Sequence, residues 1–146
     1  MTQPCTTHRA HPATLTAGLL AAVLIAATAA APAQAAGTVL STQTLAVDGV
    51  EVTAKGTIIG SRAQFSIELN THMGDLTNDL SKSRLIAAGA KYTNGQWSGD
   101  PAGGHHRSGR ITFFGRGKSV GVIALRLSGW LKPVTFRWDS KGQPLR

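Results

Sequence analysis

The residues best suited to chemistry in this chain lie in one short run, residues 103–109, which reads Gly-Gly-His-His-Arg-Ser-Gly. Two adjacent imidazoles, His105 and His106, are followed by the guanidinium of Arg107. Imidazole nitrogens ligate transition metals and exchange protons near neutral pH, and a guanidinium grips carboxylate or phosphate in a bidentate geometry. Glycines on both sides let the backbone come close to a bound group. The pattern predicts a polar loop site.

A third histidine, His72, stands in a polar stretch, residues 71–81, that also contains Asp75. Three imidazoles with a carboxylate form a donor set that suits zinc or copper. We therefore expect a site for a divalent transition metal at His72, Asp75, His105 and His106. The spacing matches neither His-x-Glu-x-His nor His-Glu-x-x-His, and no cysteine ligand is present. An alternative stays open in which the histidines bond backbone groups and hold the loop closed.

Three further side chains are candidates for contact with a bound ligand: Arg107, Trp97 and Glu68. Arg107 would clamp an anionic group, or pair with Asp100 or Asp75 across the loop. Trp97 would offer a flat aromatic face of the kind that stacks on sugar rings. The chain has no nucleophile-elbow motif, and no pair of carboxylates stands out for glycoside cleavage. We expect a binding protein rather than an enzyme.

The elements that must position these groups are short strands. Residues 63–70 alternate strictly, with apolar side chains on one face and polar ones on the other. Asp48-Gly49 and Asn94-Gly95 are hairpin signals, and residues 99–109 are expected to form a loop. The pattern predicts an all-β fold, an immunoglobulin-like antiparallel β-sandwich of about seven to eight strands. The other expected strands are residues 42–47, 50–59, 84–88, 91–93, 111–114, 119–127 and 134–138.

The first 35 residues are typical of a secretory signal peptide. Arg9 makes the n-region positive, and Ala33-Gln34-Ala35 matches the small-x-small cleavage pattern. The apolar run between them has about a dozen residues, fewer than the roughly 18 to 20 that span a bilayer, and no second hydrophobic span follows. We expect cleavage after Ala35, a secreted or extracytoplasmic protein without a transmembrane segment, and one monomeric domain of residues 36–146 that has no cysteine.

Charge is unevenly distributed along the chain. The formal net charge is +8, and residues 101–146 hold nine Lys and Arg against Asp139 alone, whereas residues 37–100 are nearly balanced. Such asymmetry attracts polyanions. It favours a second function, that of a structural or adhesive protein binding an anionic cell-envelope polymer through its basic C-terminal half. An alternative stays open in which strands of both halves interleave and no basic patch forms. No nucleic-acid motif is present, so we expect no specific nucleic-acid partner.

Several of these residues fall into one longer pattern. Thr71-His72, Asp75-Leu76, Trp97 and the run at residues 103–109 resemble the signature of an uncharacterised family of small exported prokaryotic β-sandwich domains. That signature reads Thr-His…Asp-Leu…Trp…Gly-Gly-His-His-Arg-x-Gly, and the resemblance spans roughly residues 65–114. It implies a sandwich fold, but no activity. It also implies that one constellation contains His72, Asp75, His105, His106 and Arg107.

Overall fold

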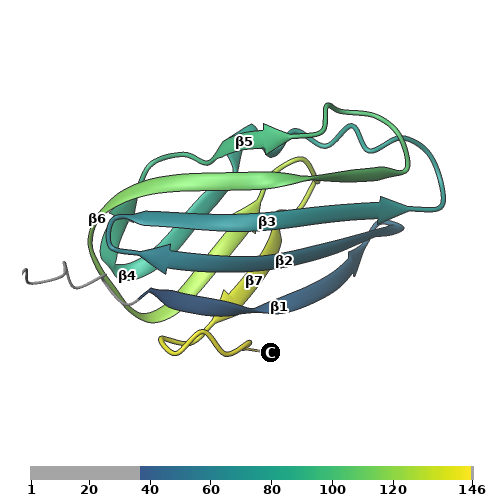
Figure 1. Ribbon diagram of the computed structural model, residues 1–146. Coiled ribbons are helices and arrows are strands. Elements are labelled where there is room, and N and C mark those ends of the chain that lie inside the picture. Colours follow the sequence, from purple (N-terminus) through teal and green to yellow (C-terminus); the bar gives the residue numbers. More distant parts are fainter. Residues whose placement is uncertain (1–36, 146) are drawn as a thin grey trace, which may run out of the picture. The chain divides into compact units, whose positions relative to one another are not determined.

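A computed structural model describes residues 37–145 of the chain. In that range seven strands form one curled antiparallel sheet (Figure 1). The elements are β1 (Thr38–Val47), β2 (Val50–Ile59), β3 (Arg62–Thr71), the 3₁₀ turn η1 (Leu80–Lys82), β4 (Arg84–Tyr92), β5 (Gln96–Gly99), β6 (His106–Leu127) and β7 (Val134–Trp138). Within this range no helix is long and apolar enough to cross a membrane. The signal peptide predicted for residues 1–35 lies outside the described residues.

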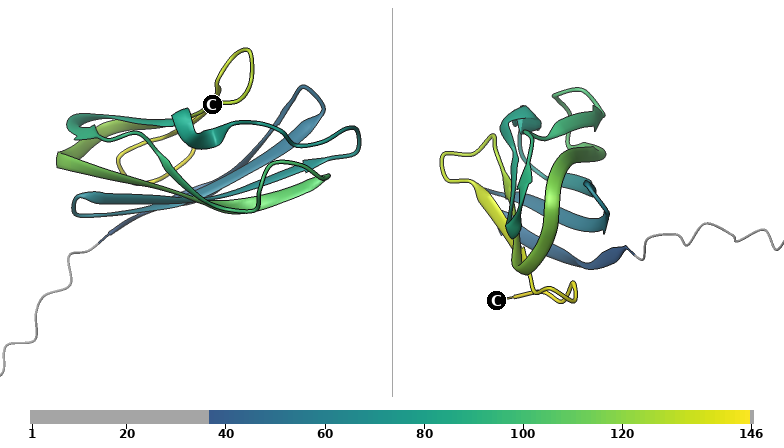
Figure 2. Two further views of the ribbon diagram at one scale, coloured as in Figure 1. Left: turned by 90° about the horizontal axis from the view of Figure 1, so that it is seen from above. Right: turned by 90° about the vertical axis from the view of Figure 1, so that its left-hand side faces the viewer.

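Strand β6, 22 residues long, joins the two halves of the sheet. Its first half pairs with β3 on one edge and with β5 on the other, and its second half pairs with β4 and β7. Figure 2 shows how the sheet curls over itself along this strand. Gly117 and Gly121 have positive φ angles, 90° and 69°. Glycine tolerates this backbone conformation, and it occurs where strands bulge and bend.

The sequence-based expectation is wrong at two points around β6. Residues 111–114 and 119–127 are parts of one strand, and that strand begins at His106 rather than after Gly109. It stays unbroken because β3 pairs with it as far as Phe114 and β4 takes over at Gly115. The hairpin expected at Asn94-Gly95 does not form either. β4 and β5 both pair antiparallel with β6, so they run in the same direction and are not partners.

The core inside the curl is built largely from aromatic rings. Phe65, Phe113, Phe136 and Trp138 are fully buried. The ring centroids lie between 5.8 and 6.1 Å apart in three pairs: Phe65–Phe113, Phe65–Trp138 and Phe136–Trp138. The Trp138 Nε1–H donates to the carbonyl of Ser41 over 2.7 Å, which holds β7 against β1. The prediction of an all-β fold is confirmed, with seven strands in the described part of the chain. The immunoglobulin-like sandwich stays a prediction.

Candidate functional site

Two loops meet at one end of the sheet: residues 72–79 after β3, and residues 100–105 before β6. Leu76 joins them through its backbone. Its N–H donates to the carbonyl of Gly104 over 2.9 Å, and its carbonyl accepts from the N–H of Gly103 over 3.0 Å. Gly103 and Gly104 have φ angles of 123° and 70°, which side chains disfavour. The paired glycines of the run therefore serve this loop-to-loop contact.

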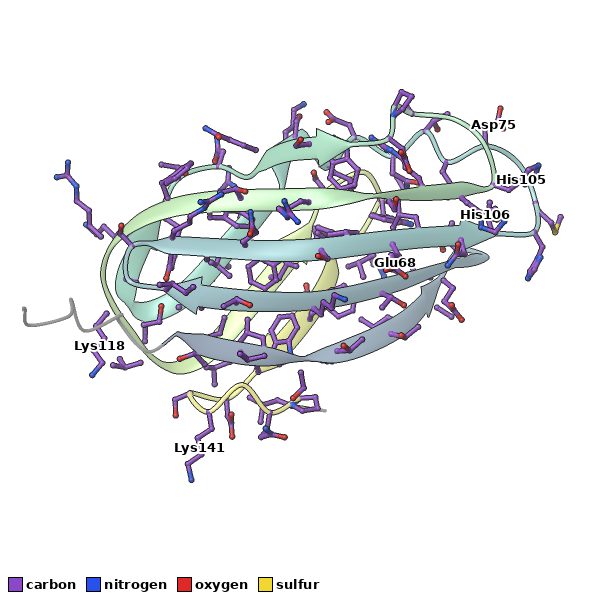
Figure 3. All side chains as sticks on the ribbon, viewed as in Figure 1. Glu68, Asp75, His105, His106, Lys118 and Lys141 are labelled. Atoms are coloured by element: carbon purple, nitrogen blue, oxygen red, sulfur yellow. The ribbon has the colours of Figure 1, made fainter. Side chains whose placement is uncertain are left out.

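The histidine and aspartate side chains of these loops face solvent. His72, His105, His106 and Asp75 are all exposed, and Figure 3 shows Asp75, His105 and His106 at this end of the sheet. The Nδ1 of His106 lies 2.7 Å from Oδ1 of Asn70 across the β3–β6 ladder. Because an amide oxygen only accepts, Nδ1 donates, and in the neutral ring Nε2 is the nitrogen that accepts. His106 therefore makes a cross-strand bond.

The structure does not gather the expected metal ligands into a cluster. Among residues 37–145, no three His, Cys, Asp or Glu side chains are grouped so that they could hold a metal ion. Glu68 lies farther along β3, in register with Ser108, and its side chain is exposed on the outward face (Figure 3). His106 also lacks the loop freedom on which the expectation relied, because it begins β6. The zinc or copper site stays a prediction.

Arg107 points the other way, into the protein. Only 6% of its surface is exposed. Its Nε donates to the carbonyl of Asp100 over 3.1 Å, and its Nη1 donates to the carbonyl of Asn78. The guanidinium carbon lies 5.0 Å from the ring centroid of Trp97, within the range of a cation–π contact. Arg107 thus ties both loops to β5, and its pairing partners are backbone carbonyls rather than the carboxylates expected from sequence. We refer to these contacts as the arginine clamp.

Trp97 is a member of the clamp, since its Nε1–H donates to the carbonyl of Asp100 over 3.2 Å. The ring is partly buried and packs on the core. A Cβ added to Gly109 would lie 2.6 Å from that ring, so the last glycine of the run makes room for Trp97. Sequence reasoning assigned Trp97 to a ligand and did not identify Asn78 or Asn70, whose contacts depend on the fold.

The carboxylate of Asp100 closes the same loop. It accepts hydrogen bonds from the backbone N–H of Ser108 over 2.8 Å and from its hydroxyl over 3.0 Å. These bonds, with a smaller contribution from the charge of Arg107, hold the pKa of Asp100 below its usual value of 3.8. Asp79 caps η1 by accepting from the N–H of Ser81 over 2.9 Å. The Ser81 bonds lower the pKa of Asp79 in the same way.

A second candidate surface lies on the outward side of β4, β6 and β7, three strands that contain no aspartate or glutamate. Arg84 stands directly opposite Arg126 in the β4–β6 register, and Arg137 stands opposite Ala124, two residues from Arg126. Cross-strand partners and alternate residues share a face, so the three exposed guanidinium groups are neighbours. Together with Lys82, which borders a groove of about 230 Å³ beside Arg84 and Arg126, they form the arginine face.

Comparison with known proteins adds no relative. No protein-family model, no curated protein and no solved structure matches the chain. The resemblance of residues 65–114 to the exported β-sandwich family therefore stays a prediction.

Replacing Arg107 should destabilise the protein, although the residue lies in the run singled out for binding. In Arg107→Met the stem is kept, but the carbonyls of Asn78 and Asp100 lose a charged donor. We expect the free energy of unfolding in urea to fall by about 2 to 4 kcal/mol. Arg110→Met removes an exposed arginine from the same strand and should change it by less than about 0.5 kcal/mol. Equal effects of the two substitutions would contradict the clamp.

Low pH should lower the stability that Asp79 and Asp100 give to the loops at this end of the sheet. Because the pKa values of Asp79 and Asp100 are lower in the folded protein than in the unfolded chain, their contribution to stability is complete well above pH 3.8 and is lost as the pH falls through and below that value. Asp79→Asn/Asp100→Asn does not titrate at these positions. We expect this variant to melt below the wild type at about pH 7 and to lose less melting temperature between about pH 5 and pH 3, followed by circular dichroism. Equal losses would refute this account.

Thermal unfolding after chelation tests the metal prediction. Zinc or copper(II) that binds only the folded state raises the melting temperature. If imidazoles hold the metal, the rise is absent in His105→Ala/His106→Ala and disappears as the pH falls through about 6.5, since protons compete for the same nitrogens. No rise in the wild type with either metal would refute the site.

Proposed function

We propose that the chain is a secreted, non-catalytic binding module, an immunoglobulin-like sandwich, that docks on an anionic cell-envelope polymer through the arginine face. The observation that carries the proposal is the register pairing of Arg84 with Arg126. Directly opposed residues of an antiparallel pair have Cβ atoms about 4.5 to 5.5 Å apart, and like charges in such positions destabilise the sheet. An anion bound between the two guanidinium groups turns that repulsion into attraction.

The like-charged pairing is repeated along the same two strands. Lys91 of β4 stands opposite Arg116 of β6, and both side chains are exposed. This second pair lies seven residues beyond Arg84 on β4, which corresponds to roughly 20 Å of strand. A small ion reaches only one of the pairs. An extended polymer with repeated anionic groups reaches both, which favours a polymer over a single inorganic anion.

We favour the arginine face over the histidine loops because the arginine of those loops already bonds to the protein's own backbone. Arg107 is buried and donates to two carbonyls of its own chain. Arg84, Arg126 and Arg137 are exposed, and no carboxylate is present on the strands that carry them. An exposed guanidinium without an acidic neighbour keeps its donors for an external phosphate or carboxylate.

Removing the opposed pair should weaken binding and strengthen the fold. For Arg84→Ser/Arg126→Ser we expect the affinity for inorganic polyphosphate, measured by titration calorimetry, to fall about tenfold or more, since two charge contacts are lost. The free energy of unfolding should rise by roughly 0.2 to 1 kcal/mol, because the repulsion is gone. Binding of the wild type should weaken steeply with added salt.

Lys55→Ser/Arg110→Ser is the matched control. It removes the same charge from β2 and from the first half of β6, where both residues flank Ser66 in register. We expect this variant to bind polyphosphate within about twofold of the wild type at equal salt, because only general charge is changed. Equal weakening by both double variants would refute the arginine face as the docking surface, and so would binding that is indifferent to salt.

A further inference from the structure

A groove of about 700 Å³ opens where β6 bends, beside the end of β4. Its size falls in the range of roughly 300 to 1,000 Å³ that is usual for small-molecule sites. Lys91 and Arg116, the second like-charged pair, both line it. Its lining residue Gly117 precedes Lys118 in the chain, and Figure 3 shows Lys118 at the opposite end of the sheet from Asp75 and His105.

Two glycines of β6 line the groove at the bend, and each is required for a steric reason. A Cβ on Gly115 would lie 2.5 Å from the ring of Tyr92, and a Cβ on Gly117 would strike the carbonyl oxygen of Gly89. Gly117 also has a φ of 90°, which disfavours a side chain. The two glycines therefore let the Tyr92 ring and the backbone at Gly89 pack directly against β6, which fixes Tyr92 beside the groove.

The lining combines aromatic and cationic side chains, because β4 supplies Tyr92 and Lys91 and β6 supplies Phe114 and Arg116. Phe114 lines the groove and keeps 45% of its surface exposed. Tyr92 also lines it, and its hydroxyl lies 2.8 Å from that of Ser119, which fixes the orientation of the ring. Aromatic faces next to open space are suited to stacking against a flat ring. A neutral apolar ligand would leave the cations of the same lining without a partner.

Two cations line this space, and a third lies over one of its aromatic rings. Lys91 and Arg116 lie on its lining, and the Arg62 guanidinium lies 6.0 Å from the ring centroid of Phe114. No carboxylate is among the residues that line the groove. Two neighbouring cations in one lining favour an anionic ligand, and an arginine binds a carboxylate in a bidentate geometry. A ring that bears a carboxylate can contact both the aromatic and the cationic side chains of the lining.

From this geometry we infer that the groove binds one acidic sugar residue, a ring bearing a carboxylate, within the polymer that the arginine face holds. The inference rests on the proposed function and deepens it. The arginine face and the Lys91–Arg116 pair attract any polyanion, whereas the Phe114 wall selects a polymer built from rings. The polymer is therefore an acidic polysaccharide rather than a polyphosphate.

Titration calorimetry with two polyanions tests the inference. The probes are polygalacturonate, whose repeating unit is a ring with a carboxylate, and inorganic polyphosphate, which has charge but no ring. We expect Phe114→Ala to weaken polygalacturonate binding about tenfold, as the loss of one stacking contact does, while polyphosphate binding changes by less than about twofold. Arg116→Ser should weaken both. Ile59→Ala, which removes a similarly exposed apolar side chain outside the groove, should weaken neither.

Phe114→Leu keeps an apolar side chain and guards against a folding defect in Phe114→Ala. We expect it to melt like the wild type and still to lose affinity for polygalacturonate. As a direct readout, digalacturonic acid should shift the backbone amide NMR signals of Gly115 and Gly117 and leave those of Gly103 and Gly104 unchanged.

The outcomes separate the two proposals. Wild-type binding of both polyanions that depends on Arg84 and Arg126 but not on Phe114 overturns the acidic-sugar groove and leaves the arginine face in place. Binding of polygalacturonate that requires Phe114 but is unaffected by Arg84→Ser/Arg126→Ser supports the groove and overturns the arginine face. Binding of neither polyanion overturns both.

Discussion

The backbone pairing of the 22-residue strand β6 constrains this protein more than any other interaction, because four of the other six strands pair with it. β6 pairs with β3 and β5 in its first half and with β4 and β7 in its second. An unpaired backbone amide in the interior is costly, so the bend of β6 lies where its pairing with β3 ends and its pairing with β4 begins. The aromatic core fills the space that the curl encloses.

Each part of β6 has a different role because of its neighbours. At its beginning the alternation of the strand turns His106 outward and Arg107 inward, and the buried guanidinium joins two loops to β5. At the bend, glycines admit the close packing of β4, and a groove there is lined by cations and aromatic rings. At its end Arg126 meets Arg84 on an open face. Chemically similar side chains thus serve as a structural clamp at one end and as an exposed charge at the other.

Local pattern was a good guide wherever the contacts were local. Strict alternation located β3, and Asp48-Gly49 does join β1 to β2 in an antiparallel pair.

The sequence pattern failed as a guide where strand pairing is long-range. The stretch from Gly115 to Gly121 reads as a break, since its glycines have low strand propensity, yet β4 holds it in the ladder. Asn94-Gly95 reads as a hairpin, although β4 and β5 lie on β6 and not on each other. The histidine run was correctly singled out as a special segment, but its neighbours Asn70 and Asn78 come from other parts of the chain.

The sequence by itself determined the all-β class, the excess of cations after residue 100 and the presence of a glycine-flanked histidine run, because composition and period-2 alternation are properties of neighbours along the chain. Tertiary structure alone decided that Arg107 is buried and that Arg84 faces Arg126. It also decided that Lys82 and Arg84 of the first half of the chain lie beside Arg126 of the second half. The reason is register. A shift of one residue in the β4–β6 ladder would turn every side chain of one strand to the other face. The sequence of neither segment alone specifies which residues will be paired.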